Sequence, residues 1–214
     1  MSRREEILAE MGLSPVWVLR NKPSPAKSEM PSGWIELKQA VPACKACGLH
    51  ASRTQTVFGV GDENADWLLI GEAPGADEDR LGDPFVGQAG KLLDNMLAAI
   101  GLNRRENVYI ANVLKCRPPG NRNPEPDEVA KCTPFLLQQI GLIQPKLIIA
   151  MGRFAAQTLL DTDASIASLR GRLHSYAGVP LIVTYHPAYL LRTLPDKAKA
   201  WEDLVFARRT MATL

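Results

Sequence analysis

The chain has 214 residues, of which 46% are hydrophobic and 22% are charged, so its apolar content suffices for one hydrophobic core and a modest appendage. This composition excludes a disordered, collagen-like or coiled-coil chain as a description of the whole. The 25 Lys and Arg residues outnumber the 23 Asp and Glu residues by only two, so the net charge indicates no class of partner.

The amino-terminal segment is predicted to be an extension outside the core. Residues 2–12 are charged and favour a short helix, but they lack the apolar stretch of a secretory signal. Four prolines, interleaved with Ser and Lys, then indicate a tether. We therefore assign residues 1–31 to an extension and residues 32–214 to one domain. No apolar run approaches the roughly 18 residues that span a bilayer, which favours a cytoplasmic protein that does not bind membranes.

From Trp34 onward, short apolar runs alternate with segments of helical periodicity. Four runs are typical of buried strands, at residues 67–70, 108–114, 147–151 and 181–185. Helices are expected over Leu92–Ile100, between the second and third strands, over 153–160, and near the carboxyl terminus. This order predicts an α/β fold, namely a three-layer αβα domain with a central four-stranded parallel sheet.

Two helical details are less regular. Pro134 either begins a helix capped by Thr133 or marks a kink within one, and both interpretations remain open. In the last helix, Trp201, Leu204 and Val205 are expected to form the buried face.

Polar residues, glycines and prolines follow each predicted strand. In open parallel sheets, ligands bind beyond the carboxyl ends of the strands, so these segments are where chemistry is expected. They contain Gly71–Gly75 after the first strand, Asn112 at the end of the second, Gly152 and Arg153 after the third, and His186 and Pro187 after the fourth.

Four cysteines form the pattern Cys44-x2-Cys47 and Cys116-x15-Cys132. Two thiolates three residues apart can bind one metal centre from a single turn, and a second pair completes four sulfur ligands. Buried free thiols or a disulfide are the alternative, which is less favoured in a cytosolic chain with a C-x-x-C motif. Zinc and an iron–sulfur cluster both accept four cysteines, and the spacing does not separate them.

A glycine-rich, acidic segment covers residues 71–90. Its glycines permit close approach of backbone to a ligand, and its acids are suited to activating water or holding a divalent cation. It is not a phosphate-binding loop of the Walker type, because the G-K-[ST] ending is absent. A surface loop with solvated acids and Phe85 in the core is the structural alternative.

Histidine and asparagine at the strand ends also have two interpretations. His186 is either a structural residue or a catalytic group; a lone histidine is more often structural, and its position after a strand makes the two interpretations about equal. Asn112 is either a turn residue or a reader of a nucleobase edge, because its amide carries both a donor and an acceptor.

Together these residues resemble the iron–sulfur uracil-DNA glycosylases, family four. The resemblance runs from about Cys44 to Arg192 and on to the end of the last helix. It is carried, in the family's order, by Gly71-Glu-Ala-Pro-Gly75 with Glu78-Asp79, Pro84-Phe-Val-Gly87 with Ala89-Gly90, Ala111-Asn-Val-Leu-Lys-Cys-Arg-Pro-Pro119 with Asn123-Pro124, and His186-Pro-Ala-Tyr-Leu-Leu-Arg192. Each motif alone is weak, but the ordered set with the cysteine spacing is specific.

The resemblance implies an enzyme that hydrolyses the N-glycosidic bond of uracil in single- or double-stranded DNA, acting as a monomer. It implies a structural 4Fe-4S cluster on Cys44, Cys47, Cys116 and Cys132. It also implies that Phe85 stacks on a flipped uracil, that Asn112 reads its edge and that His186 stabilises the departing anion.

The remaining residues carried over line the pocket, handle water or contact DNA. Backbone around Glu72, Ala73 and Pro74 would line the pocket. Glu72 would position or deprotonate the attacking water, because Ala73 stands where several related glycosylases have an acid. The segment Leu190, Leu191 and Arg192 resembles the loop that wedges into the minor groove. The loop Gly120–Pro124 lacks the His of a covalently linking relative, so ordinary hydrolysis is expected.

Two other functions are compatible with parts of the pattern. One is a metal-dependent nuclease or phosphohydrolase that holds Mg²⁺ on acids of the glycine-rich segment. Its ligands would be Glu72, Asp77, Glu78, Asp79 and Asp83. The other is a DNA-binding module that carries zinc or a cluster and has no enzymatic activity.

Overall fold

The structure is a computed structural model, and it describes residues 3, 10, 11 and 33–214. The chain separates into two units, Met1–Met30 and Pro31–Leu214, and the elements below belong to the second unit. Apart from residues 3, 10 and 11, the helix expected over residues 2–12 and the tether lie outside the described residues. In the described part of the chain, no helix combines the length and the apolar character needed to cross a bilayer.

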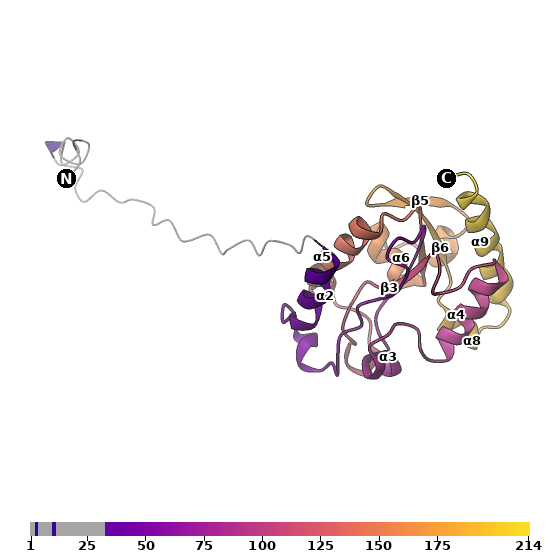
Figure 1. Cartoon of the computed structure of the whole chain (residues 1–214), viewed down its shortest axis with the longest axis horizontal. Coiled ribbons are helices and arrows are strands. Elements are labelled where there is room, and N and C mark those ends of the chain that lie inside the picture. Colours follow the sequence, from indigo (N-terminus) through magenta and orange to yellow (C-terminus); the bar gives the residue numbers. More distant parts are fainter. Residues whose placement is uncertain (1–2, 4–9, 12–32) are drawn as a thin grey trace. The chain divides into compact units, whose positions relative to one another are not determined.

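A six-stranded sheet with the order β1-β3-β2-β4-β6-β5 forms the centre of the domain (Figure 1). Its four inner strands are parallel, as predicted. They are β2 (Trp67–Gly71), β3 (Val108–Asn112), β4 (Leu147–Met151) and β6 (Val179–Thr184). The edge strands β1 (Val60–Gly61) and β5 (Leu173–Tyr176) are antiparallel to their neighbours and were not predicted.

The two edge strands lack the signals on which the sequence prediction depends. β1 has only two residues, too few to show any periodicity. β5 is joined to β6 by Ala177 and Gly178, whose φ angles of 50° and 82° are typical of a tight hairpin turn. Alanine rarely adopts a positive φ, so the sequence does not mark this turn.

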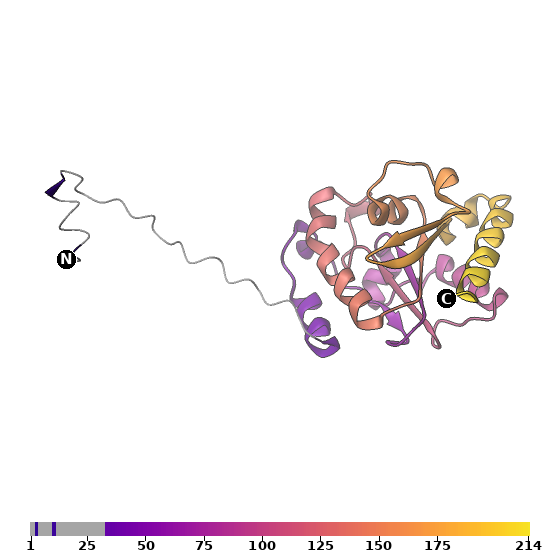
Figure 2. The ribbon, with the colours of Figure 1, turned by 90° about the horizontal axis from the view of Figure 1, so that it is seen from above.

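Helices cover both faces of the sheet, which confirms the three-layer prediction. Alternate residues of β2 point to opposite faces: Leu68 and Ile70 pack with α5 and α6, whereas Trp67 and Leu69 pack with α4 and α9. Figure 2 shows α5 and α9 on opposite sides of the sheet. The helices are α2 (Trp34–Ala43), α3 (Ala76–Leu81), α4 (Gln88–Ala99), α5 (Pro126–Ile143), α6 (Arg153–Leu160), α7 (Ile166–Leu169), α8 (Pro187–Arg192) and α9 (Asp196–Met211), with 3₁₀ turns η1 (Gly48–Ala51) and η2 (Pro119–Asn121).

Pro134 lies inside α5, which runs without interruption from Pro126 to Ile143. The helix therefore begins at Pro126 and not at Pro134, and Thr133 does not cap it. The Thr133 hydroxyl instead donates to the carbonyl of Val129, one turn earlier, at 2.8 Å. Packing of the apolar face of α5 on the sheet outweighs the loss of one helical hydrogen bond.

The buried face of α9 differs from the prediction. Leu204 is buried, but Val205 is half-buried and Trp201 is 48% exposed. Asp203 occupies the core instead, because its carboxylate accepts hydrogen bonds from Arg170 Nε at 2.7 Å and Thr184 Oγ1 at 2.8 Å. These hydrogen bonds offset the free-energy cost of burying the charge. The apolar pattern of the sequence does not reveal such pairing.

Candidate functional site

A cleft of about 770 Å³ lies where the four inner strands end. Glu72 follows β2, Asn112 ends β3, Gly152 follows β4, and His186 stands two residues after β6. All six residues predicted to bind the substrate line this cleft, namely Glu72, Ala73, Pro74, Phe85, Asn112 and His186. Their convergence follows from the parallel order of the strands, which brings these ends to one rim.

Phe85 forms one wall of the cleft in a constrained conformation. Its φ of 55° is unusual for a residue with a side chain, and the residue is 6% exposed. The space around it depends on two glycines. A Cβ on Gly71 would lie 2.8 Å from the Phe85 ring, and a Cβ on Gly90 would lie 1.7 Å from the Phe85 carbonyl oxygen. Arg104 Nη2 donates to the same carbonyl at 3.0 Å, which holds the turn from behind.

Glu78 joins the two loops that flank the cleft. Its carboxylate accepts backbone N–H bonds from Gly75 at 3.1 Å and from Val86 at 3.0 Å. The neighbouring Asp79 is buried and accepts two bonds from the Thr54 N–H, at 3.0 and 3.1 Å. These two carboxylates therefore organise the glycine-rich segment.

His186 lies against Phe85 in the lining of the cleft and is the N-cap of α8. The two rings are stacked, with centroids 5.4 Å apart and planes 29° apart. His186 Nδ1 accepts the Ala188 N–H at 3.1 Å, so the ring proton of the neutral form resides on Nε2. Burial, assisted by the positive charge of Arg192, lowers the His186 pKa to about 4. The side chain is therefore a neutral Nε2–H donor near pH 7.

Glu72 is a half-buried carboxyl group in the same cleft. Burial raises its pKa to about 7, and the positive charge of Arg153 opposes this rise. Its main chain is held in place because the Glu72 carbonyl accepts the Leu114 N–H at 3.0 Å. A carboxyl group with a pKa near neutrality is suited to exchanging a proton with water.

Asn112 presents an unpaired acceptor to the cleft. The residue is 2% exposed, and within the described residues its Oδ1 has no hydrogen-bond partner. An orphaned buried carbonyl is costly, so the arrangement favours a ligand that donates a hydrogen bond at this point.

The segment predicted to contact DNA is divided by the structure. Arg192 lines the cleft and Leu191 is 41% exposed. Leu190 is 1% exposed and packs with Met96 of α4 and Leu204 of α9. The Leu190 side chain therefore belongs to the core in this structure, and its contact with DNA stays a prediction.

The four cysteines Cys44, Cys47, Cys116 and Cys132 line one cavity between η1 and α5, and all are free thiols. Arg53 Nη1 donates to Cys116 Sγ at 3.0 Å, and the Lys115 N–H donates to Cys132 Sγ at 3.2 Å. Among the described residues, no three His, Cys, Asp or Glu side chains form a group that could hold a single metal ion. A cluster accommodates more widely spaced thiolates, because each one bonds a different iron atom.

Comparison with known proteins identifies the family. The model of the uracil DNA glycosylase superfamily matches residues 58–205. The type-4 uracil-DNA glycosylase of Archaeoglobus fulgidus is 48% identical, covering 73% of this chain and 82% of the relative. The corresponding enzyme of Thermotoga maritima is 46% identical, covering 76% of this chain and 85% of the relative. The chain belongs to the type-4 uracil-DNA glycosylases. It is a DNA repair enzyme whose family removes uracil from DNA.

Membership of this family overturns both alternative functions. A DNA-binding module without activity is excluded by the enzymatic family. A magnesium-dependent hydrolase is overturned by the same family membership, and within residues 33–214 no three of the acids form a group that could hold a metal ion. The resemblance between this glycosylase and the family is thus confirmed, whereas the roles of individual residues remain predictions.

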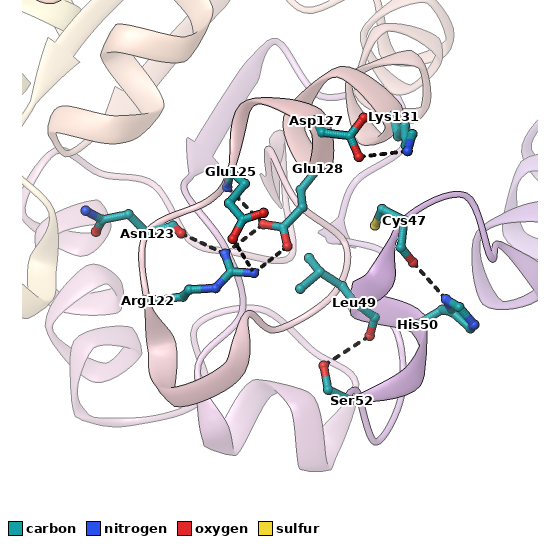
Figure 3. Close-up of polar contacts among 10 residues, drawn as sticks. All are labelled: Cys47, Leu49, His50, Ser52, Arg122, Asn123, Glu125, Asp127, Glu128 and Lys131. Carbon is teal, nitrogen blue, oxygen red and sulfur yellow. Dashed lines mark hydrogen bonds and ion pairs between the residues drawn. The ribbon is translucent and has the colours of Figure 1, made fainter.

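Two tyrosines of the glycosylase cleft were not predicted. Tyr185 and Tyr189 line it as a stacked pair with centroids 5.2 Å apart, and their places on either side of His186-Pro187 could have indicated this. Arg122 also lines the cleft, but its guanidinium donates to both Glu128 carboxylate oxygens, at 2.9 and 2.6 Å (Figure 3). Arg122 therefore braces the start of α5.

Proposed function

We propose that this glycosylase hydrolyses the N-glycosidic bond of a uracil nucleotide that has left the base stack and entered the cleft. The observation that carries the proposal is the convergence of Glu72, Phe85, Asn112 and His186 on one cleft. The proposed substrate is uracil-containing DNA, single- or double-stranded, and the proposed active form is a cytoplasmic monomer.

Recognition of uracil is assigned to Phe85 and Asn112. The Phe85 ring replaces stacking that the base loses when it leaves its neighbours. The unpaired Asn112 Oδ1 accepts the N3–H of uracil, while the amide N–H donates to O4. Cytosine has an acceptor at N3 and an amino donor at C4. Asn112 Oδ1 would then face an acceptor and the amide N–H would face a donor, so neither hydrogen bond would form.

Bond cleavage is assigned to His186 and Glu72. The C1′–N1 bond breaks with its electron pair moving to uracil, and the His186 Nε2–H donates to O2, where negative charge gathers. Water adds its oxygen to C1′ and passes a proton to the Glu72 carboxylate. Ionised Glu72 also favours the positive charge on the sugar. Ala73 has no ionisable group, which leaves Glu72 as the acid that handles water.

Contact with DNA is assigned to Leu191 and Arg192. Leu191 is an exposed apolar side chain beside the cleft, suited to filling the gap that the flipped base leaves. Arg192 lines the cleft with a positive charge that is suited to a backbone phosphate.

A 4Fe-4S cluster is proposed on Cys44, Cys47, Cys116 and Cys132. The donors from Arg53 and Lys115 to two of the sulfurs fit thiolate ligands, because such bonds stabilise negative charge on sulfur. The cluster when bound would supply a structural crosslink between η1 and α5, with no part in bond cleavage.

The test is release of free uracil from a uracil-containing oligonucleotide, measured with and without EDTA. We expect equal release in both conditions and an alkali-sensitive abasic site in the product. A matched strand with thymine in place of uracil is the control. Loss of activity in EDTA, or a strand that stays alkali-resistant, would refute the proposed reaction.

A further inference from the structure

The Lys115 side chain ends in an ammonium group that is buried between β3 and α5. The residue is 1% exposed, and Nζ donates to the Asn112 main-chain carbonyl at 2.9 Å and to Gln139 Oε1 at 2.5 Å. Both acceptors are uncharged and buried. Burial of an ammonium group is costly, and two neutral acceptors compensate for it poorly. Negative charge on the nearby Cys132 sulfur would offset part of this cost, and the bond to the Asn112 carbonyl gives a second reason for a lysine at this position.

The contact with Asn112 lies where β3 loses a neighbour. β1 pairs with Tyr109 and Ile110 but does not extend to Asn112. On the other side of β3, the Val113 N–H donates to the Gly71 carbonyl of β2 at 3.0 Å. In a trans peptide, the C=O and N–H point in opposite directions, so the Asn112 carbonyl points away from β2. Lys115 Nζ therefore donates to the Asn112 carbonyl on the side of β3 where β1 does not pair with it.

The same residue contacts the cysteine cavity. The Lys115 main-chain N–H donates to Cys132 Sγ at 3.2 Å, and Cys116 is the next residue. Lys115 lines the cavity itself. One residue thus connects the end of β3 with the segment that carries two of the four cysteines.

We propose that Lys115 is a positioning residue, which fixes Asn112 in its base-reading orientation by holding the Asn112 carbonyl from the side of the cysteines. This inference rests on the proposed role of Asn112. Without the ammonium group, the last peptide of β3 has an unpaired carbonyl and is held only on the β2 side, by the Val113 N–H bond to Gly71. The side-chain Oδ1 of Asn112 has no hydrogen-bond partner in the described residues. A shift of the main chain would therefore turn the amide away from the base.

The experiment is a double-mutant cycle of Lys115→Met and Asn112→Ala, with single-turnover uracil excision as the readout. Lys115→Met keeps the length of the side chain and removes its donors. We expect it to slow excision by roughly 10-fold to 100-fold, the scale of a misplaced binding group. In the Asn112→Ala background, it should slow excision by less than about 2-fold, because Lys115 acts through Asn112.

Gln139→Leu is the matched control. It removes the other acceptor of the ammonium group and the Nε2–H bond to the Phe58 carbonyl, but it leaves the bond to Asn112 in place, so excision should stay within about 3-fold of the parent enzyme. Thermal midpoint, iron content and absorbance near 400 nm are measured for each variant, and rates are expressed per iron-loaded chain. Should Lys115→Met fail to fold, the cycle is run with Gln139→Leu in all four members, so that no Gln139 acceptor is orphaned.

Three outcomes would overturn the inference. Lys115→Met with parental excision, or the same fold loss in both backgrounds, would show that Lys115 does not act through Asn112. A loss fully explained by lower iron content would assign Lys115 to the cluster. Parental activity of Asn112→Ala alone would instead refute the role of Asn112, which separates failure of the base-reading proposal from failure of this one.

Discussion

At the scale of single residues, His186 illustrates how position sets chemistry. Its Nδ1 is occupied by the Ala188 N–H, and its burial keeps the ring neutral. His186→Ala removes the donor to the departing base, so excision should slow by about 10²-fold or more, the scale of losing one oxyanion donor. Single-turnover kinetics measure the loss, and an unchanged thermal midpoint controls for folding. Excision at the parental rate would remove His186 from the mechanism.

The proposed role of Glu72 predicts a reaction that depends on pH. The Glu72 pKa of about 7 means that the carboxylate form, which accepts the proton, is lost as the pH falls below 7. Excision should therefore decline about tenfold per pH unit on the acidic side, with a midpoint near 7. Glu72→Gln should be slower and should lack this limb. Arg153→Gln removes the charge that opposes the rise in the Glu72 pKa, so the midpoint should move to higher pH. A profile that is flat from pH 5 to 8 would contradict the assignment.

At the scale of elements, two helical glycines make opposite predictions. A Cβ on Gly90, in the first turn of α4, would meet the Phe85 carbonyl at 1.7 Å, whereas a Cβ on Gly141 in α5 would meet no atom within 4 Å. Gly90→Ala should lower the free energy of unfolding by about 1–3 kcal/mol and displace the Phe85 turn. Gly141→Ala should raise it by about 0.5–1 kcal/mol. Chemical denaturation measures both, and equal effects would contradict the steric explanation.

Elements that the sequence predicts well are those in which local pattern and tertiary role agree. β4 was predicted with its observed limits, because five consecutive apolar residues occur in a strand buried on both faces. α6 was likewise predicted at its observed limits, between Gly152 and Asp161. By contrast, the turn that begins the pairing of β5 has Ala177 in an unusual conformation. The burial of Leu190 results from packing between α4, α8 and α9, which the local sequence pattern does not show.

The candidate site shows the same division. That the cleft gathers residues from several strand ends follows from parallel topology, and the motifs identify those residues. The stack of Phe85 on His186 joins segments about a hundred positions apart, and the missing Cβ atoms that permit the Phe85 turn are visible only in three dimensions. The buried Lys115 was also overlooked, because lysine is the residue least expected inside a protein.

At the scale of the whole molecule, the cysteine cavity links parts of the chain that are far apart in sequence. Cys44 and Cys47 precede the sheet, whereas Cys116 and Cys132 lie between β3 and β4. The purified enzyme should be brown, with broad absorbance near 400 nm and about four irons per chain. Cys132→Ser should lower the iron content and the thermal midpoint together. A colourless protein that contains zinc would refute the cluster.

With His186 in its proposed role, the hydrogen bond at its Nδ1 predicts which modified bases this enzyme should remove fastest. A neutral imidazole with one committed nitrogen can polarise O2 but has no spare proton to hand over, so the pyrimidine must leave as an anion. Electron-withdrawing substituents at C5 of the base stabilise such an anion. Uracils that carry a small substituent of this kind should therefore be excised faster than uracil itself. Across a series of similar size, the logarithm of the excision rate should therefore rise with the acidity of the free base at N1.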